Sequence, residues 1–364
     1  MGLAARPSHL TGALGPYLSD SLCWAISNTT LGNSLTLLVG EAMQDYHLAL
    51  ERTITRYSQQ ADTLAEAARH HFTSPGKRTR SQLLFAATPH IQNIQALVHA
   101  AAAIELIHEA SIVHDDIQDK TNRRRGLPTV WRKFGADAAL LLGDHLVAAA
   151  FRSIAEAPDI DDIKGTLIVA LSESVSRAAS GQHLQLTNQT CSDVEAFYVN
   201  VAVNKTGALL ALPLQFASLF NQQVATGALA ARRCGEQLGL AYQILDDLKP
   251  YAMPSMLADD EDMQNRVITA PVAACSRLFP HVEPFQTLIK KTDMRDKATL
   301  ECQRWLDTAV ANARYETTFL DQAVARVVEQ FIGQRLSQKL APTKNAAPRY
   351  SAYSPRVTAR VEAV

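Results

Sequence analysis

The chain has 364 residues, a formal net charge of −1 at pH 7, 47% hydrophobic residues and 20% charged residues. This balance is typical of a globular protein with a sizeable core, and it argues against binding to nucleic acid or to an anionic membrane. The five cysteines are scattered and form no CxxC pair, which indicates reduced thiols and a cytoplasmic location. No apolar run reaches the roughly 18 residues that span a bilayer, and the N-terminus lacks a secretory pattern.

The hydrophobic pattern divides the chain into three parts. Residues 1–40 carry short apolar stretches broken by glycine and proline, which predicts a partly helical leader. Residues 41–340 place apolar side chains at three- and four-residue steps without sustained strand alternation, which predicts one all-α domain. Residues 341–364 are rich in Pro, Ala and Ser, which predicts a disordered tail.

A basic cluster follows the first clear break, at residues 74–76. Lys77, Arg78 and Arg80 stand at the start of the next predicted helix. The N-terminus of a helix favours anions, so cations and backbone N–H groups converging there would form an anion site. A solvated turn is the alternative.

An acidic cluster ends the long apolar segment at residues 95–117, which we predict to be a buried helix. Asp115 and Asp119 lie one turn apart on one face of this helix, with Asp116 beside them. Three carboxylates on an apolar helix repel each other and resist burial. A hard divalent ion such as Mg²⁺, which prefers oxygen ligands, would neutralise them.

Two arginines follow this cluster directly. Arg124 and Arg125 carry planar guanidinium groups suited to phosphate oxygens. Together with the aspartates they favour a metal-bridged phosphate ester. The alternative is a solvated helix end followed by a turn at Gly126 and Pro128.

Two further helices are predicted in the middle of the chain. The first covers residues 163–180 and is expected to end at Gly181, and the second starts near Asp193. The second helix carries Lys205 and Thr206 in an apolar context. The lysine either extends along the helix to the surface or faces a polar cavity.

A second acidic cluster ends the apolar segment at residues 232–248. Asp246 and Asp247 close this predicted helix, and Gln243 precedes them by one turn. Two acidic helix ends that face each other need neutralisation, which is the strongest internal indication of a metal cluster. Residues 249–268 are predicted to be a loop or lid, and its acidic run at 259–262 is expected to be solvated.

Seven short motifs, taken in order, resemble those of the trans-polyprenyl diphosphate synthases. The resemblance covers roughly residues 40–335. The motifs are GKRTR at 76–80, ELIHEASIVHDDIQD at 105–119, RRGLPT at 124–129, GQHLQL at 181–186, NKTG at 204–207, YQILDD at 242–247 and TAPV at 269–272.

The resemblance implies an all-α isoprenoid synthase fold, with antiparallel helices around a deep apolar cavity. It implies a homodimer, or a heterodimer with a related subunit, and Mg²⁺ as cofactor. The metal ligands it implies are Asp115, Asp116, Asp119, Asp246 and Asp247. The catalytic residues, which also meet the allylic diphosphate, would be Arg124, Lys205 and Gln243, with Thr206 lining the carbocation. The diphosphate of isopentenyl diphosphate would be held by Lys77, Arg80, His108 and Arg125.

The family also implies a way to estimate product length. Ala110 and Ser111, five and four residues before Asp115, are small where short-chain members place aromatic residues. Gln185 and TAPV resemble long-chain members. We therefore expect a product of C20 or longer.

The second acidic motif departs from the family pattern. Pro250 replaces the last carboxylate of DDxxD, and the lysine expected in a downstream GK step is missing. Three functions remain open: an active prenyltransferase, a terpene cyclase derived from the family, and a non-catalytic or regulatory subunit of a hetero-oligomeric synthase. The nearest cyclase-type metal triad, Asn188, Ser192 and Glu195, has the wrong last spacing.

Overall fold

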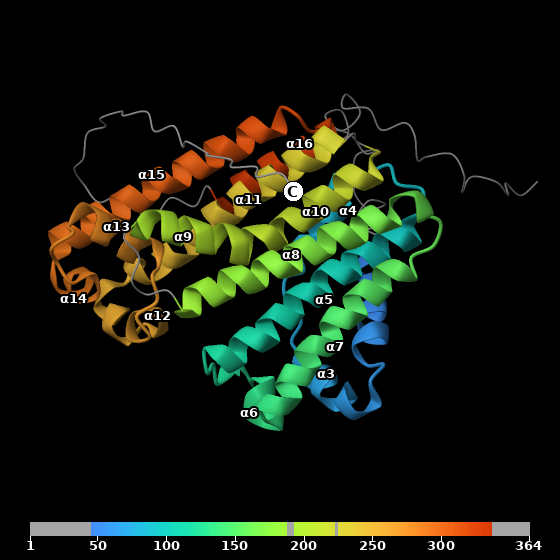
Figure 1. The fold of residues 1–364 in the computed structure, drawn as a ribbon, viewed down its shortest axis with the longest axis horizontal. Coiled ribbons are helices and arrows are strands. Elements are labelled where there is room, and N and C mark those ends of the chain that lie inside the picture. The colour runs from blue at the N-terminus through green and yellow to red at the C-terminus, as the bar shows by residue number, and fades with distance from the viewer. Residues whose placement is uncertain (1–44, 188–192, 223–224, 337–364) are drawn as a thin grey trace, which may run out of the picture.

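The protein folds into a bundle of helices with one short hairpin (Figure 1). The structure is a computed structural model and describes residues 45–187, 193–222 and 225–336. The predicted leader at 1–40 and the predicted tail at 341–364 lie outside the described residues. The expectation of an all-α fold is confirmed.

The described part begins with a helix at residues 45–58. The labelled α-helices are α3 (Ala65–Phe72), α4 (Thr79–Ala87), α5 (Ile94–Gln118), α6 (Val130–Phe134), α7 (Ala136–Ala155), α8 (Asp161–Thr187), α9 (Val194–Ala202), α10 (Ala208–Phe220), α11 (Ala225–Leu248), α12 (Glu261–Gln264), α13 (Ala270–Leu278), α14 (Pro284–Lys290), α15 (Thr292–Thr317) and α16 (Gln322–Phe331). The other segments are the 3₁₀ turns η1 (Asp62–Leu64), η3 (Lys249–Ala252) and η4 (Pro254–Asp259), the π-helical turns η2 (Val203–Gly207) and η5 (Ile332–Leu336), and the strands β1 (Arg123–Arg124) and β2 (Leu127–Pro128).

Helix α5 is the central helix of the bundle. It is apolar on all sides, and the alanines at positions 100–103 are fully buried, as expected of a helix surrounded by others. Helices α4, α7 and α10 pack against it, and small side chains let them approach closely. The sequence therefore builds a rigid rod whose acidic end is held in a fixed place.

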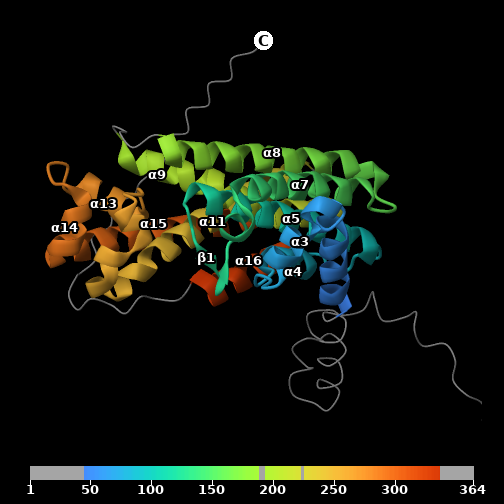
Figure 2. The same ribbon diagram turned by 90° about the horizontal axis from the view of Figure 1, so that it is seen from below.

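Helices α10, α11 and α15 continue the bundle beside α5 (Figure 1). Glycine brings α11 against α10, because a Cβ atom on Gly235 would lie 2.3 Å from Ala211 Cα. Helix α8 runs along one face of the bundle, over α7 and α10 (Figure 2). The long helices thus run side by side, and several end near the hairpin and α12.

Two helices, α5 and α7, are long and apolar enough to cross a membrane by length and composition. Within the most apolar stretch of each, 89% of α5 and 44% of α7 is buried inside the bundle. Helix α5 is therefore a core helix. Helix α7 packs against α5, α6 and α8 and leaves a face with Leu140 and Leu141 open to solvent.

Two predicted helix boundaries were wrong, and one element was not predicted. Helix α8 does not end at Gly181 but continues to Thr187. Helix α11 begins at Ala225, before the expected start. A β-hairpin forms where no strand was expected, because Arg125 (φ 50°) and Gly126 (φ 82°) adopt the left-handed geometry of a two-residue hairpin turn.

The segment between α11 and α13, predicted as a loop or lid, consists of short turns. It contains η3, η4 and α12. The Asp260 side chain caps α12 by accepting a hydrogen bond from Met263 N at 3.2 Å. The acidic run is exposed or half-buried, in agreement with the prediction.

Candidate active site

The first acidic motif lies at the C-terminal end of α5, as predicted. Burial raises the pKa of Asp115, Lys205 opposes this shift, and the Asp119 carboxylate adds to it. Burial likewise raises the pKa of Asp119, with Lys205 and Arg124 opposing and Asp116 adding to the shift. The protein alone therefore compensates the negative charge of this pair incompletely.

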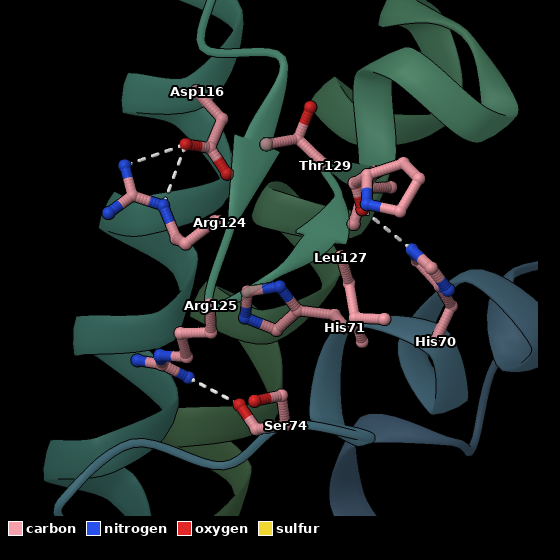
Figure 3. Close-up of a pocket in the computed structure, with 10 residues that line it drawn as sticks. His70, His71, Ser74, Asp116, Arg124, Arg125, Leu127 and Thr129 are labelled. Atoms are coloured by element: carbon pink, nitrogen blue, oxygen red, sulfur yellow. Dashed lines mark hydrogen bonds and ion pairs between the residues drawn. The ribbon is translucent and has the colours of Figure 1, made fainter.

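The third carboxylate of this motif has a different role. Asp116 is buried and accepts hydrogen bonds from Arg124 Nε at 2.8 Å and from its terminal nitrogen at 2.7 Å (Figure 3). This pair joins the end of α5 to strand β1. Arg124 would have to turn away from Asp116, or share it, in order to reach a phosphate.

The donor set at the end of α5 fits a hard divalent ion. Asp115 and Asp119 offer carboxylate oxygens, the ligands that Mg²⁺ prefers. Across residues 45–187, 193–222 and 225–336, no three His, Cys, Asp or Glu side chains converge closely enough to hold an ion by themselves. An ion bound here would complete its shell with water and substrate oxygens.

The second acidic motif is held more tightly by the protein. Asp247 is only 7% exposed, and it accepts hydrogen bonds from Tyr198 Oη at 2.8 Å, Ala270 N at 2.8 Å and Gln243 Nε2 at 2.7 Å. Burial raises its pKa to about 7, even though these donors favour the charged form. The oxygens of Asp247 are thus occupied by hydrogen-bond donors of the protein itself.

The neighbouring Asp246 faces outward. Its side chain is 47% exposed and forms an ion pair with Lys249, three residues later. The next residue is Pro250, so this end of the motif offers a cation and a proline where the family pattern has a carboxylate. Only Asp246 is open to solvent and to ligands at the end of α11.

A chain of side-chain contacts connects the two motifs. Lys205 Nζ lies 3.5 Å from Asp115 Oδ2 and donates to Gln185 Oε1 at 3.1 Å. Its neighbour Thr206 donates to Gln243 Oε1 at 2.8 Å, and Gln243 in turn donates to Asp247. The predicted residues Lys205, Thr206 and Gln243 therefore meet between the two acidic helix ends.

The π-helical turn η2 and two glycines make this meeting possible. A Cβ atom on Gly181 would lie 2.5 Å from Lys205 N, and one on Gly239 would lie 2.3 Å from Gly207 Cα. Helices α8 and α11 therefore pack directly on the backbone of η2 from two sides. The π-turn itself is a feature often found at functional sites.

The residues predicted to hold the second diphosphate come from the start of α4, from α5 and from the hairpin, and we call them the cradle: Lys77, Arg80, His108 and Arg125. Arg80 and Arg125 both lie close enough to His108 to act on its charge. The Arg80 Nε and His108 Nδ1 atoms are buried without a hydrogen-bond partner. Burial lowers the pKa of both side chains, so His108 is a neutral imidazole. Lys77 is exposed and does not line the cavity described below. Arg125 donates to Ser74 O at 2.8 Å (Figure 3).

A cavity of about 330 Å³ opens beside these groups. Its polar end is lined by Arg80, His108, Asp115, Lys205 and Thr206, and its apolar wall comes from α5, α7, α8 and α10. Ala110 and Ser111 both line it, as the product-length hypothesis requires. The cavity thus joins a charged mouth to an apolar interior.

Three functional neighbours escaped sequence reasoning. Tyr198 and Glu109 are buried hydrogen-bonding partners of the site. Asp262 keeps an exposed surface, but the surrounding protein partly desolvates its carboxylate, and this desolvation and the charges of Asp260 and Asp119 raise its pKa to about 6; it therefore lies near the end of α5. A carboxylate within the apolar IHEAS stretch could have indicated Glu109, whereas no local pattern indicates Tyr198.

The cyclase-type triad receives no support from its one described member. Asn188 and Ser192 lie outside the described residues. Glu195 forms an ion pair with Arg277 Nε at 3.1 Å, which ties α9 to α13.

Comparisons with known proteins agree with this geometry. The sequence model of the polyprenyl synthetase family matches residues 61–305. A geranylgeranyl diphosphate synthase of Saccharolobus solfataricus is 34% identical over 192 residues, which is 51% of this chain and 57% of that protein. A prenyl transferase of Synechocystis is 30% identical over 256 residues, covering 68% and 77% of the two chains. The chain thus matches somewhat over half the length of the first of these relatives.

Solved structures show the same fold. A geranylgeranyl pyrophosphate synthetase from Geoglobus acetivorans superimposes with a TM-score of 0.69 at 24% identity, covering 80% of this chain and 98% of the other. A polyprenyl synthase from Caulobacter crescentus, complexed with calcium and isoprenyl diphosphate, gives a TM-score of 0.65 at 23% identity, covering 81% and 96%.

Proposed function

The chain belongs to the polyprenyl synthetase family, and from this premise we propose that it condenses isopentenyl diphosphate with an allylic diphosphate. The proposed product is a trans-polyprenyl diphosphate of C20 or longer. The observation that carries the proposal is the single cavity onto which Asp115, Lys205 and Thr206 open together with Arg80 and His108. Two anionic substrates can therefore be placed side by side over one apolar channel.

We assign separate groups of residues to the metal and to the allylic diphosphate. Asp115, Asp119 and Asp246 would hold Mg²⁺, which as a Lewis acid supplies charge stabilisation to the departing diphosphate. Asp116 and Asp247 are proposed to support these ligands. Lys205, Arg124 and Gln243 receive the allylic diphosphate. Lys205 already lines the cavity and Gln243 is held beside Thr206, whereas Arg124 would have to release or share Asp116 to join them. Cations and dipoles placed in advance stabilise developing charge most effectively.

The reaction requires that the two substrates be aligned and that water be excluded from the cavity. The C–O bond of the allylic diphosphate breaks, and the diphosphate leaves with the electron pair. The double bond of isopentenyl diphosphate forms the new C–C bond, and the adjacent proton passes to the released diphosphate. Thr206 lines the carbocation, and the apolar wall excludes water that would otherwise quench it.

The test is incubation with Mg²⁺, isopentenyl diphosphate and each allylic primer, followed by chromatography. Elongated diphosphates support the proposal, and reactions without primer provide the control. Released hydrocarbon would instead indicate a cyclase.

A second function is favoured by the end of α11. Asp247 is occupied by protein donors, Asp246 is paired with Lys249, and Pro250 supplies no ligand. A non-catalytic subunit of a hetero-oligomeric synthase would have such a reduced second motif. Absence of turnover alone, with turnover appearing when a related synthase subunit is added, would support this function over the first.

We also propose that the chain forms a homodimer through the open face of α7. Leu140 and Leu141 are about half exposed on this helix, and large apolar side chains that are exposed next to each other are a feature of interfaces. Light scattering is expected to give a dimer mass for the wild type and for Tyr315→Arg, which changes an exposed side chain elsewhere. Leu141→Arg is expected to give a monomer; an unchanged dimer mass would place the interface on another face.

A further inference from the structure

Glu109 is a buried carboxylate to which the reaction above gives no role. It lies on α5 directly after His108 and is only 1% exposed. Its Oε2 atom is 2.8 Å from His71 Nε2, and its Oε1 atom is 2.8 Å from an Arg78 terminal nitrogen and 3.6 Å from one of Arg125. A carboxylate buried this completely requires such partners.

The charge of Glu109 is set by these neighbours. Burial by itself would raise the pKa of Glu109, but the hydrogen bond from His71 and the positive charges around it lower the pKa to about 2. Glu109 is therefore ionised at any working pH. Because a carboxylate only accepts hydrogen bonds, His71 Nε2 is the donor.

Arg125 is the first cradle residue that Glu109 orients. Its guanidinium group lies against Gly76, where an added Cβ atom would be 2.8 Å from one terminal nitrogen. It donates to Ser74 O, and Glu109 attracts it from 3.6 Å without a short hydrogen bond. Arg125 therefore keeps N–H groups for a phosphate oxygen while its position is fixed.

Arg78 is the second point of attachment. It caps α4 in the left-handed conformation with φ 51°, a geometry that needs support from its surroundings. Its side chain is buried between Glu109 and Glu51, with Arg78 Nε donating to Glu51 at 2.7 Å. Fixing Arg78 fixes the turn between Lys77 and Arg80.

We propose that Glu109 is a positioning residue for the diphosphate of isopentenyl diphosphate, which it serves by holding Arg125 and the Lys77–Arg80 turn in place. The inference rests on the proposed function and deepens it. Glu109 acts through the cradle residues and does not touch the substrate. The neighbouring Glu51 provides a matched comparison, because it binds the same Arg78 from the exposed side.

Direct binding is the first test. The cradle offers cations and an imidazole, so it should bind isopentenyl diphosphate in EDTA, and calorimetry can measure this. Glu109→Gln is expected to raise the Kd about tenfold, whereas Glu51→Gln, which loosens Arg78 but leaves Arg125 untouched, should raise it by only about two- to threefold. Equal Kd values in both variants, or no binding by the wild type, would overturn the inference.

Steady-state kinetics separate positioning from a merely structural role. Glu109→Gln is expected to raise the KM for isopentenyl diphosphate while kcat and the KM for the allylic primer change little. A structural role would instead lower Tm and kcat together and leave the two KM values in their original ratio. If Glu109→Gln does not fold, His71→Leu removes the donor to Glu109 and should raise the same KM by a smaller factor; an unchanged KM in that variant counts against the proposal.

The two proposals can fail separately. Turnover by the wild type with an unchanged Kd in Glu109→Gln removes the inference and leaves the proposed function intact. Binding that depends on Glu109 without any turnover, with or without an added synthase subunit, removes the proposed function alone.

Discussion

The acidic ends of α5 and α11 are similar in sequence, yet the protein uses their carboxylates in different ways. At α5, Asp115 lines the cavity and Asp119 is exposed one turn later; both have raised pKa values, and Lys205 is a close counter-charge to Asp115. At α11, Asp247 accepts three hydrogen bonds from protein donors, and Asp246 pairs with Lys249. One end keeps its negative charge available to ligands, while the other uses much of it internally.

This difference separates carboxylates that are open to ligands from Asp247, which is a structural link between helices. The α5 end has the donor set for a divalent ion and a diphosphate. The α11 end joins Tyr198 of α9 to the start of α13 through Asp247, and so organises the opposite wall. Four predictions follow this contrast, from the largest expected effect to the smallest.

Asp115→Asn should abolish most activity if the α5 end holds the metal. The substitution removes a ligand charge that acts on the developing transition state, so kcat is expected to fall roughly 100- to 1,000-fold. Turnover with Mg²⁺ and an allylic primer is the measurement. Asp161→Asn, on the exposed start of α8, is the matched control and should keep full activity. An active Asp115→Asn enzyme would contradict the assignment of metal binding to α5.

Asp247→Asn should change the pH dependence of the free energy of unfolding more than it changes kcat. Burial raises the folded-state pKa of Asp247 from its ordinary value of 3.8 to about 7. Between these values the folded protein keeps a proton that the unfolded chain has lost. The free energy of unfolding should therefore fall as the pH rises through this window, by up to about 1.4 kcal/mol for each pH unit.

Urea unfolding between pH 5 and pH 8 checks this prediction. The asparagine carries no titrating group, so the variant should lose this part of the pH dependence. Parallel curves for the wild type and the variant would show that Asp247 stays ionised in the folded protein, held by its three donors.

Ala110→Phe tests whether the chain grows from the α5 end. Ala110 is 1% exposed and lines the cavity about one turn before Asp115. A phenyl ring there should block the channel and shorten the product by at least one C5 unit, as measured by chromatography of the dephosphorylated products. Ala311→Phe changes an exposed alanine on α15 and should leave the product distribution as it is, and the same distribution in both variants would place the growing chain elsewhere.

Pro250→Asp should make the metal-binding capacity of the α11 end more similar to that of the α5 end. It restores a third carboxylate to the α11 motif, so the Mg²⁺ concentration that gives half-maximal activity is expected to fall by a few-fold at most. Ser255→Asp adds the same charge to the exposed turn nearby and should have no such effect. A large gain in rate would mean that the second motif limits the natural protein.

Sequence reasoning succeeded where local pattern and packing agree. The apolar run before Asp115 predicted α5 to within one residue at each end. A helix that is apolar on all sides must be buried among other helices, so its length can be read from the length of the apolar run. The residues Lys205, Thr206 and Gln243, which the family motifs assign to one substrate, are neighbours in the structure, and their catalytic roles stay a prediction. The predicted end of α8 at Gly181 was wrong, because that glycine serves a close helix contact rather than a helix end.

By itself the sequence determined the all-α class, the two acidic helix ends, the basic cluster at the start of α4 and the family. These depend on periodicity and on residue types that are close in the chain. Only the tertiary structure decided that Asp247 is turned into the protein and that Glu109 meets Arg125 and His71. Those contacts join helices and turns far apart in sequence, and whether a carboxylate faces a ligand or an internal donor depends on which backbone packs beside it.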